Sequence, residues 1–263
     1  MKRAGLIADA ARVARRIRAA PDLAAALRGA DYVQENTPEV LEVKRAMFAQ
    51  LDRLAPARAI LASSTSSLQP SLFTAELKGR ARCLVAHPAN PPYLVPIVEL
   101  CGAPWTSRAT LRRARSFLDA AGMTPIEVKR EIDGFILNRL QIALLNEAFR
   151  LVDGGFVTSD DLDRTLKDGL ALRWAFMGPM ETIDLNAPAG TADYFKRYGG
   201  LIRRLDRDMR ARPDWSDALA GRLDAARRRA VPLKAHGRAT EWRDRRLMAL
   251  LAHKNAMNKS SRE

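Results

Sequence analysis

The sequence predicts an α/β domain that is followed by an all-helical domain, and three observations support this. Short apolar runs typical of buried strands alternate with helical patterns as far as Val128. From Gly134 onward no strand pattern recurs, and apolar residues return at helical spacing. Hydrophobic residues make up 47% of the 263 residues, enough for a substantial core. We therefore expect an α/β domain over residues 1–131 and a helical domain over 132–263.

The first domain is expected to alternate strands and helices in chain order. Helices are predicted over 4–19, 23–27, 37–54, 70–77 and 107–121, and strands over 31–36, 59–62, 83–86, 97–101 and 124–128. Thr37 is a suitable N-cap for the third helix, with Pro38 at its first position. Three prolines near Asn90 favour a rigid extended loop. Strands that alternate with helices imply parallel pairing.

The second domain is expected to begin with a long helix that opens at Gly134. Two glycines, Gly154 and Gly155, are expected to end it, and Thr158 should cap the next helix. The predicted helices carry more apolar residues than a small bundle can bury. We therefore expect this domain to form a homodimer.

The candidate chemistry centres on His87 and Glu99. Glu99 lies inside an apolar strand pattern, where a carboxylate is costly unless it has a partner. His87 ends the preceding apolar run and is the obvious candidate. An imidazole that is hydrogen-bonded to a buried carboxylate keeps one tautomer and can act as a general base. The alternative is a structural histidine at a strand end, and the two residues alone do not decide between these readings.

Three segments taken together point to a known family. They are SSTSSL at residues 63–68, HPANPP at 87–92 with a glutamate twelve residues after the histidine, and GFILNRL at 134–140. In this order they resemble the 3-hydroxyacyl-CoA dehydrogenase family, and most closely its lambda-crystallin (L-gulonate 3-dehydrogenase) branch. The resemblance runs from about Ala30 to about Asn186. It implies a Rossmann-like NAD-binding domain, NAD as cofactor, a helical dimerisation domain, and oxidation of a 3-hydroxy acid or 3-hydroxyacyl-CoA.

The resemblance also implies catalytic roles for four residues. His87 would take the proton from the substrate hydroxyl as hydride leaves for the nicotinamide, and Glu99 would hold and polarise His87. Ser66 and Asn138 match positions that contact the reacting oxygen and the nicotinamide end. Without the family, Ser66 would read as a turn residue, and Asn138 as a helix amide that needs a partner.

Three further residues match cofactor-side positions of the family: Glu39, Lys44 and Asn90. Each also has a simpler explanation. Glu39 would suit the first turn of a helix, Lys44 would be an ordinary exposed helix residue, and Asn90 would stabilise the proline loop.

Two departures from the acyl-CoA enzymes bear on the substrate. Ser64 stands where those enzymes commonly have asparagine, and His87-Pro88-Ala89 stands where they have His-Phe-Phe. The lambda-crystallin branch, which these residues resemble more, acts on free hydroxy acids. A small hydroxy acid is therefore the first expectation, and an acyl-CoA the second.

A third departure concerns the dinucleotide. No two glycines are separated by one residue, so the G-x-G-x-x-G turn that holds a pyrophosphate in such folds does not occur in these 263 residues. By the family pattern the chain begins in the helix after the second strand, which would leave a strand near Ile17–Ala20 unpaired and an apolar sheet edge exposed. Two explanations are open: a true start upstream, or a shortened non-catalytic paralogue that acts as a dimerising or binding module. Either way we expect poor NAD binding by these residues.

The bulk composition weighs against several other classes. The net charge of +14 lies in residues 1–20 and 203–263. The excess is mainly arginine on alanine-rich helical patterns, which is typical of a solvated basic face, so a nucleic-acid role is disfavoured. No apolar run is long enough to span a membrane, and no signal peptide is recognisable. Cys83 and Cys101 lie in predicted buried strands, which fits free thiols in the cytoplasm. No metal-ligand spacing occurs.

Overall fold

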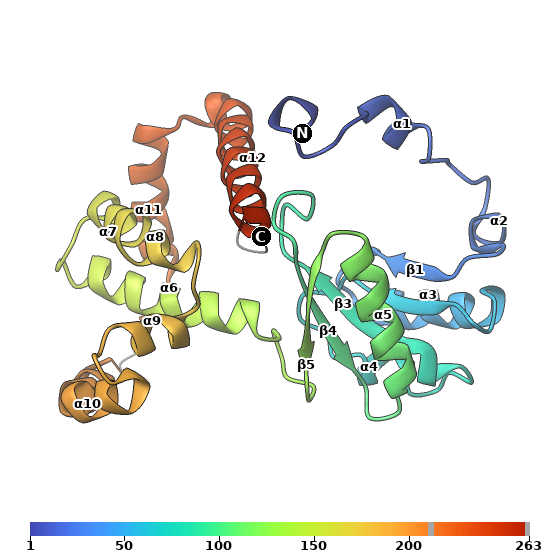
Figure 1. Cartoon of the computed structure of the whole chain (residues 1–263), viewed down its shortest axis with the longest axis horizontal. Coiled ribbons are helices and arrows are strands. Elements are labelled where there is room, and N and C mark those ends of the chain that lie inside the picture. The colour runs from blue at the N-terminus through green and yellow to red at the C-terminus, as the bar shows by residue number, and fades with distance from the viewer. Residues whose placement is uncertain (210–212, 261–263) are drawn as a thin grey trace. The chain divides into compact units, whose positions relative to one another are not determined.

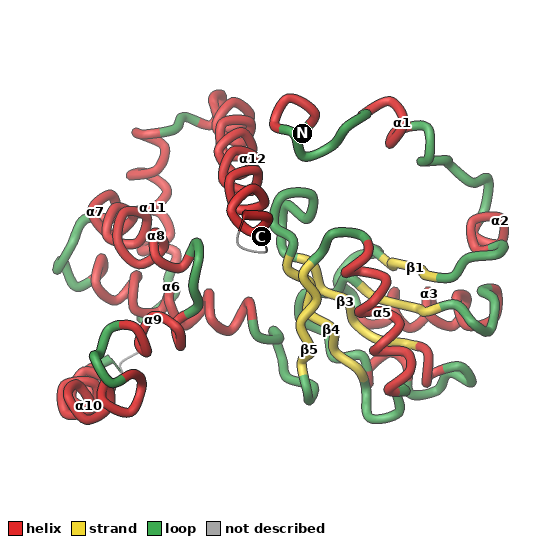
Figure 2. Tube along the Cα trace, viewed as in Figure 1, coloured by secondary structure: helices red, strands yellow, loops and turns green. Residues whose placement is uncertain are grey.

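The computed structural model describes residues 1–209 and 213–260. The chain divides into two compact units. The first contains Met1–Leu140 together with Asp244–His253, and the second contains Gln141–Arg243 together with Lys254–Glu263. The first unit holds a five-stranded, mostly parallel sheet flanked by helices, and the described part of the second is helical (Figure 2). The predicted class, a Rossmann-like domain followed by a helical domain, is confirmed.

The sheet of the first unit follows the chain in the order β1-β2-β3-β4-β5 (Figure 1). Its strands are β1 (Tyr32–Glu35), β2 (Ile60–Ser63), β3 (Cys83–Pro88), β4 (Ile97–Gly102) and β5 (Thr124–Val128). Its helices are α1 (Ala10–Ala14), α2 (Leu23–Leu27), α3 (Leu41–Leu54), α4 (Ser71–Thr74) and α5 (Arg108–Ala120), with 3-10 turns at Lys2–Ala4 and Arg80–Arg82. Helix α6 (Leu137–Asp153) begins in this unit.

Each face of the sheet carries its own apolar cluster, because neighbouring residues on a strand point to opposite faces. One cluster packs α3 and α4 against the sheet through Phe48, Leu51 and Phe73. The other packs α5 through Ala114 and Leu118. Figure 1 shows α5 on one side of the sheet and α3 and α4 on the other. The strand ends that carry the candidate residues are thus held by a core on both faces.

The pairing between β3 and β4 differs from the prediction. The pairs β1–β2, β2–β3 and β4–β5 are parallel, but β3 and β4 are antiparallel and place His87 opposite Glu99. The physical reason is the connection. A parallel pair needs a long crossover, whereas residues 89–96 form a loop without a helix, which suits an antiparallel pair.

Several predictions for the first unit were wrong, including the helix over 70–77, of which only Ser71–Thr74 is an α-helix. Helix α3 starts at Leu41 without a side-chain cap, because the hydroxyl of Thr37 donates instead to Glu35. The segment 4–19 is helical only over Ala10–Ala14 and the 3-10 turn. The predicted strand near Ile17–Ala20 does not form; a strand is stabilised by pairing, and Ile17 is 78% exposed.

The second unit consists of helices in its described residues. They are most of α6, α7 (Ser159–Thr165), a π-helical turn at Leu166–Leu170, α8 (Ala171–Trp174), α9 (Pro179–Leu185), α10 (Gly190–Asp208) and α11 (Asp217–Ala230). A 3-10 turn, Leu233–Ala235, leads to α12 (His236–Ser260), part of which belongs to the first unit. Two predicted signals are confirmed: Thr158 caps α7, and Gly155 follows α6 with a φ of 73°. Helix α6 starts at Leu137, three residues later than predicted. None of the described helices is both long and apolar enough to cross a membrane.

Candidate active site

The side chains of His87 and Glu99 form a buried pair. Nδ1 of His87 lies 2.8 Å from Oε2 of Glu99, which is a hydrogen-bonding distance, so His87 is the partner that Glu99 was expected to need. The two residues are directly opposite each other in the antiparallel register of β3 and β4. Their exposed fractions are 6% and 1%, so water competes little for this bond.

The second oxygen of Glu99 is held by the start of helix α6. Its Oε1 accepts the backbone N–H of Ile136 at 2.8 Å and that of Leu137 at 2.9 Å. A helix N-terminus carries unpaired N–H groups and a positive dipole end, so a carboxylate is stabilised there. Glu99 therefore satisfies two helix donors with one oxygen and orients His87 with the other.

These contacts determine the protonation state of Glu99. Burial by itself raises the pKa of Glu99, but the hydrogen bonds from His87, Leu137 and Ile136 outweigh it and leave the pKa below the ordinary value. An ionised carboxylate can only accept, so Nδ1 of His87 must donate. In the neutral ring Nε2 then carries a lone pair, and no hydrogen bond within the described residues uses that atom. The pair can therefore take up a proton at Nε2.

Ser66, Glu39 and Asn138 meet at the loop that follows β2, residues 64–67, which we call the serine loop. Oε1 of Glu39 accepts the backbone N–H groups of Ser66 and Ser67, each at 3.1 Å, and the hydroxyl groups of Thr65 and Ser67. Nδ2 of Asn138 donates to the backbone oxygen of Ser66 at 2.9 Å. Glu39 precedes α3 and therefore does not occupy the first turn of a helix, contrary to the simpler explanation. Its carboxylate instead organises the serine loop through these hydrogen bonds.

Lys44 is buried, which overturns the expectation of an ordinary exposed helix residue. Its side chain is 1% exposed, and Nζ lies 3.1 Å from both carboxylate oxygens of Glu35. Glu35 also accepts from the hydroxyl of Ser63 at 2.6 Å and from the N–H and hydroxyl of Thr37. Burial raises the pKa of Glu35, but the bonds from Ser63, Thr37 and Lys44 leave it below the ordinary value.

These contacts bring six of the seven predicted site residues into one connected network. Glu99 contacts the N–H of Leu137, and the next residue, Asn138, contacts the serine loop that Glu39 holds. The buried pair of Lys44 joins through Ser63, whose hydroxyl accepts the N–H of Thr65. Asn90 is the exception: it is exposed, and no described hydrogen bond involves its side chain.

Sequence reasoning missed Glu35 and Phe135. Glu35 ends β1 and neutralises Lys44, and a charged residue at the end of a short strand was the available signal. Phe135 is fully buried with its ring centroid 5.7 Å from that of His87. Its φ of 47° lies in the left-handed region, which nothing in a phenylalanine indicates in advance.

The residues at this end of the sheet fit the reacting end of a nicotinamide cofactor and a hydroxyl substrate. An accepting imidazole nitrogen, a serine and an asparagine come from β3, from the loop after β2 and from α6. The carboxyl ends of the parallel strands β1 and β2 lie at the same edge, where open α/β sheets bind ligands. No glycine-rich turn for a pyrophosphate occurs in the sequence.

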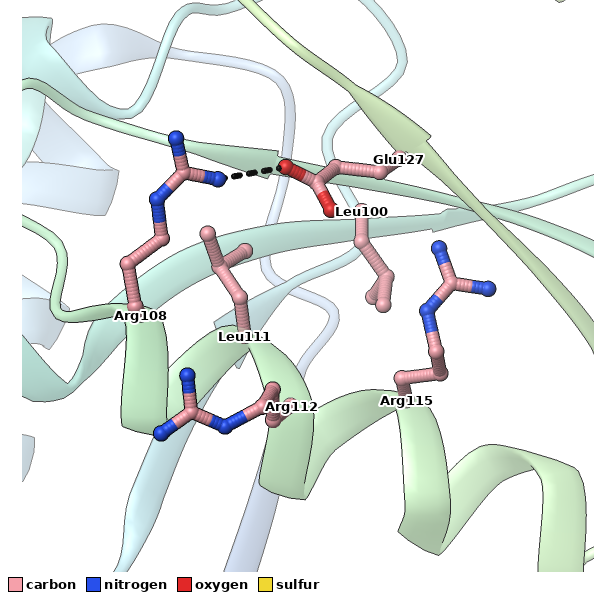
Figure 3. A pocket seen from close by; sticks show the side chains of 6 residues that line it. All are labelled: Leu100, Arg108, Leu111, Arg112, Arg115 and Glu127. Carbon is pink, nitrogen blue, oxygen red and sulfur yellow. Dashed lines mark hydrogen bonds and ion pairs between the residues drawn. The ribbon is translucent and has the colours of Figure 1, made fainter.

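Other parts of the chain offer less chemistry. Both cysteines are free thiols, and burial raises the pKa of Cys83 and of Cys101 to about 12, so neither is a ready nucleophile. The described residues contain no cluster of ligands for a metal ion. A cavity of about 160 Å³ lies on the α5 face and includes an ion pair of 3.0 Å between Arg108 and Glu127 (Figure 3). None of the seven predicted residues lines it.

Two family models match consecutive parts of the chain. The NAD binding domain of 3-hydroxyacyl-CoA dehydrogenase matches residues 2–132, and the C-terminal domain of 3-hydroxyacyl-CoA dehydrogenase matches residues 134–218. The chain belongs to the 3-hydroxyacyl-CoA dehydrogenase family. Its members are NAD-dependent oxidoreductases, so the predicted family, enzyme class and cofactor are confirmed.

Individual relatives agree with this assignment. The lambda-crystallin homolog of Bos taurus is 46% identical over 238 residues, covering 90% of this chain and 74% of its own length. The L-carnitine dehydrogenase of Bacillus cereus is 36% identical over 202 residues, covering 77% of this chain and 62% of its own. The structure of an NAD+-dependent dismutase, 5-formyl-3-hydroxy-2-methylpyridine 4-carboxylic acid 5-dehydrogenase, matches with a TM-score of 0.76 and 26% identity, covering 90% and 76% of the two chains. The resemblance to lambda-crystallins is therefore confirmed.

Breaking the buried ion pair between Lys44 and Glu35 should destabilise the first unit strongly. Lys44→Met leaves the Glu35 carboxylate buried without its cation, so we expect a loss of about 3–5 kcal/mol in the free energy of unfolding. Adding Glu35→Gln should recover much of this loss. The exposed pair Arg58–Asp31 is a matched control, and alanine at both positions should cost less than about 1 kcal/mol. Urea unfolding measures all four proteins, and equal effects of the buried and the exposed pair would contradict the argument.

The two buried glutamates should also make the free energy of unfolding depend on pH. The pKa values of Glu35 and Glu99 are lower in the folded chain than in the unfolded chain, where glutamate has a pKa of about 4.3. Their stabilisation is therefore complete above that value and is lost as the pH falls below it. Urea midpoints between about pH 5 and pH 3 should decline, and less steeply in Glu99→Gln than in the parent protein. An unchanged slope in Glu99→Gln would contradict the low pKa.

Proposed function

We propose that this site oxidises a small 3-hydroxy acid to the 3-keto acid with NAD, and that a 3-hydroxyacyl-CoA is the second candidate substrate. The observation that carries the proposal is the His87–Glu99 pair, which presents an accepting Nε2. The free acid is favoured by Ser64 and by Pro88 and Ala89 beside the base, which depart from the acyl-CoA pattern. A relative acting on L-carnitine supports a substrate other than a thioester.

The residues would divide the reaction as follows. Nε2 of His87 takes the proton of the substrate hydroxyl, and Glu99 stabilises the resulting imidazolium through Nδ1–H. The carbon that bears this hydroxyl would lose its hydride, and NAD would supply the hydride acceptor when bound. Ser66 and Asn138 position the reacting oxygen and the nicotinamide edge, and Glu39 holds the serine loop in place. We assign Lys44 to the support of that loop through Glu35, and we keep Asn90 as a cofactor-side contact.

We further propose that these 263 residues by themselves hold NAD weakly. A pyrophosphate is normally met by backbone N–H groups of a glycine-rich turn at a helix N-terminus, and the sequence has no such turn. Losing that anchor removes binding energy that keeps the nicotinamide in reacting geometry. The same observation favours a second candidate, a module that dimerises or binds without catalysis.

We also propose that residues 132–263 form the dimerisation part and residues 1–131 carry the base, and that the protein works in the cytoplasm as its free thiols suggest. Large apolar side chains on the helical unit are more than half exposed. They include Phe156, Leu172, Met180, Leu185 and Phe195. A second copy is the proposed partner that would cover such surface.

Removing the His87 base should reduce turnover without weakening the binding of the cofactor. In a fusion that places a relative's glycine-rich strand–turn–helix before Met1, His87→Gln should lower kcat by about 10²–10⁴-fold and leave the Kd of NADH nearly unchanged. His236→Gln is the matched control, because this exposed histidine starts α12. Equal losses in kcat and in NADH affinity would instead show a structural role for His87.

Titration of NADH into the 263-residue chain tests the cofactor proposal. We expect no saturation below about 1 mM, the upper end of ordinary substrate constants. Fluorescence of bound NADH reports the binding directly. Saturation at micromolar NADH would overturn the proposal and would indicate another dinucleotide site in these residues.

The mass in solution tests the dimer. Light scattering at micromolar concentration should give twice the 29.2 kDa of one chain. An aspartate at Phe156, which is 73% exposed, places a charge on the apolar surface and should shift the mass toward the monomer. A monomeric parent protein would contradict the dimer.

A further inference from the structure

Phe135 has a backbone conformation that phenylalanine rarely adopts. It is the one non-glycine residue in the described part of the chain with a positive φ, 47°, and it follows Gly134, whose φ is 72°. Its side chain is fully buried. Backbone strain of this kind persists where the surrounding structure demands it and is concentrated at functional sites.

The strained residue directly precedes the two backbone donors that hold Glu99. The backbone oxygen of Ile136 accepts the N–H of Leu140 at 3.0 Å, so Ile136 caps helix α6 and Leu137 is its first residue. The N–H groups of both point to Oε1 of Glu99. A helical φ at Phe135 would rotate the chain by about 110° about the N–Cα bond and turn these donors elsewhere.

The ring of Phe135 reaches the other partner of the pair. Its centroid lies 5.7 Å from that of the His87 imidazole, and the two planes are tilted by 39°. Since the ring is fully buried, it helps to exclude water from the His87–Glu99 bond. One residue thus contacts the base and sets the backbone that anchors its carboxylate.

We propose that Phe135 is a positioning residue for the His87 base and that Phe135 acts on this base through Glu99. Its left-handed backbone aims two N–H groups at Oε1 of Glu99, and this two-point hold fixes the carboxylate so that Oε2 keeps the proton on Nδ1 of His87. The role in turnover rests on the function proposed above. The arrangement itself requires neither substrate nor NAD, so it can be tested on the chain alone.

Two isomeric side chains separate the backbone from the ring. Phe135→Leu and Phe135→Ile remove the ring and have equal volumes, but isoleucine is branched at Cβ and strongly disfavours a positive φ. The measurement is the ¹⁵N spectrum of the His87 imidazole at alkaline pH, which reports the ring nitrogen that carries the proton. Comparison with His87→Gln assigns the signals.

We expect Phe135→Leu to keep Nδ1–H, and Phe135→Ile to lower the ratio of Nδ1–H to Nε2–H by about tenfold. Circular dichroism verifies that both variants fold. Equal proton distributions in the two folded variants would overturn the proposal, whether or not the chain proves to be a dehydrogenase.

A second variant decides the question if Phe135→Ile does not fold. Leu137→Pro keeps Phe135 but removes one of the two N–H donors, and proline is well suited to the first position of a helix. The Nδ1–H population should fall. An unchanged population would show that the donors do not orient His87 and would overturn the proposal.

Discussion

The site depends on one buried carboxylate, Glu99. A charge that is 1% exposed is tolerated when hydrogen bonds replace the lost water, and here three donors do so. These donors come from β3 and from the start of α6, so the charge of Glu99 links two strands of the sheet to the first helical turn after it. The same bonds determine the tautomer of His87. Structure and chemistry are therefore consequences of a single electrostatic requirement.

A second buried carboxylate organises the neighbouring strand ends in a related way. Glu35 is neutralised by Lys44 and binds Ser63, which in turn accepts the N–H of Thr65 in the serine loop. A buried ion pair contributes little net stability against an apolar alternative, because desolvation offsets the attraction. Its role here is orientation, since the pair is connected through Ser63 to the loop that carries Ser66.

The two carboxylates differ in what they leave available. The hydrogen bonds of Glu35 only hold other groups of the protein in place. Those of Glu99 also hold His87, and they leave Nε2 of His87 without a described hydrogen bond. An accepting nitrogen that belongs to the same hydrogen-bond network as Ser66 and Asn138 is what the proposed proton transfer requires. The membership of the chain in the dehydrogenase family agrees with that chemistry.

The sequence by itself determined the family, the alternation of strands and helices, and the His87–Glu99 pair. Apolar runs predict strands locally, and a carboxylate inside one of them requires a partner. Tertiary structure decided the antiparallel β3–β4 pairing, the burial of Lys44 and the left-handed backbone of Phe135. Each of these depends on a contact between segments distant in sequence or on the closure of a turn around Glu99. Residue type and spacing do not contain that information, because the same lysine or phenylalanine would be ordinary elsewhere on a helix.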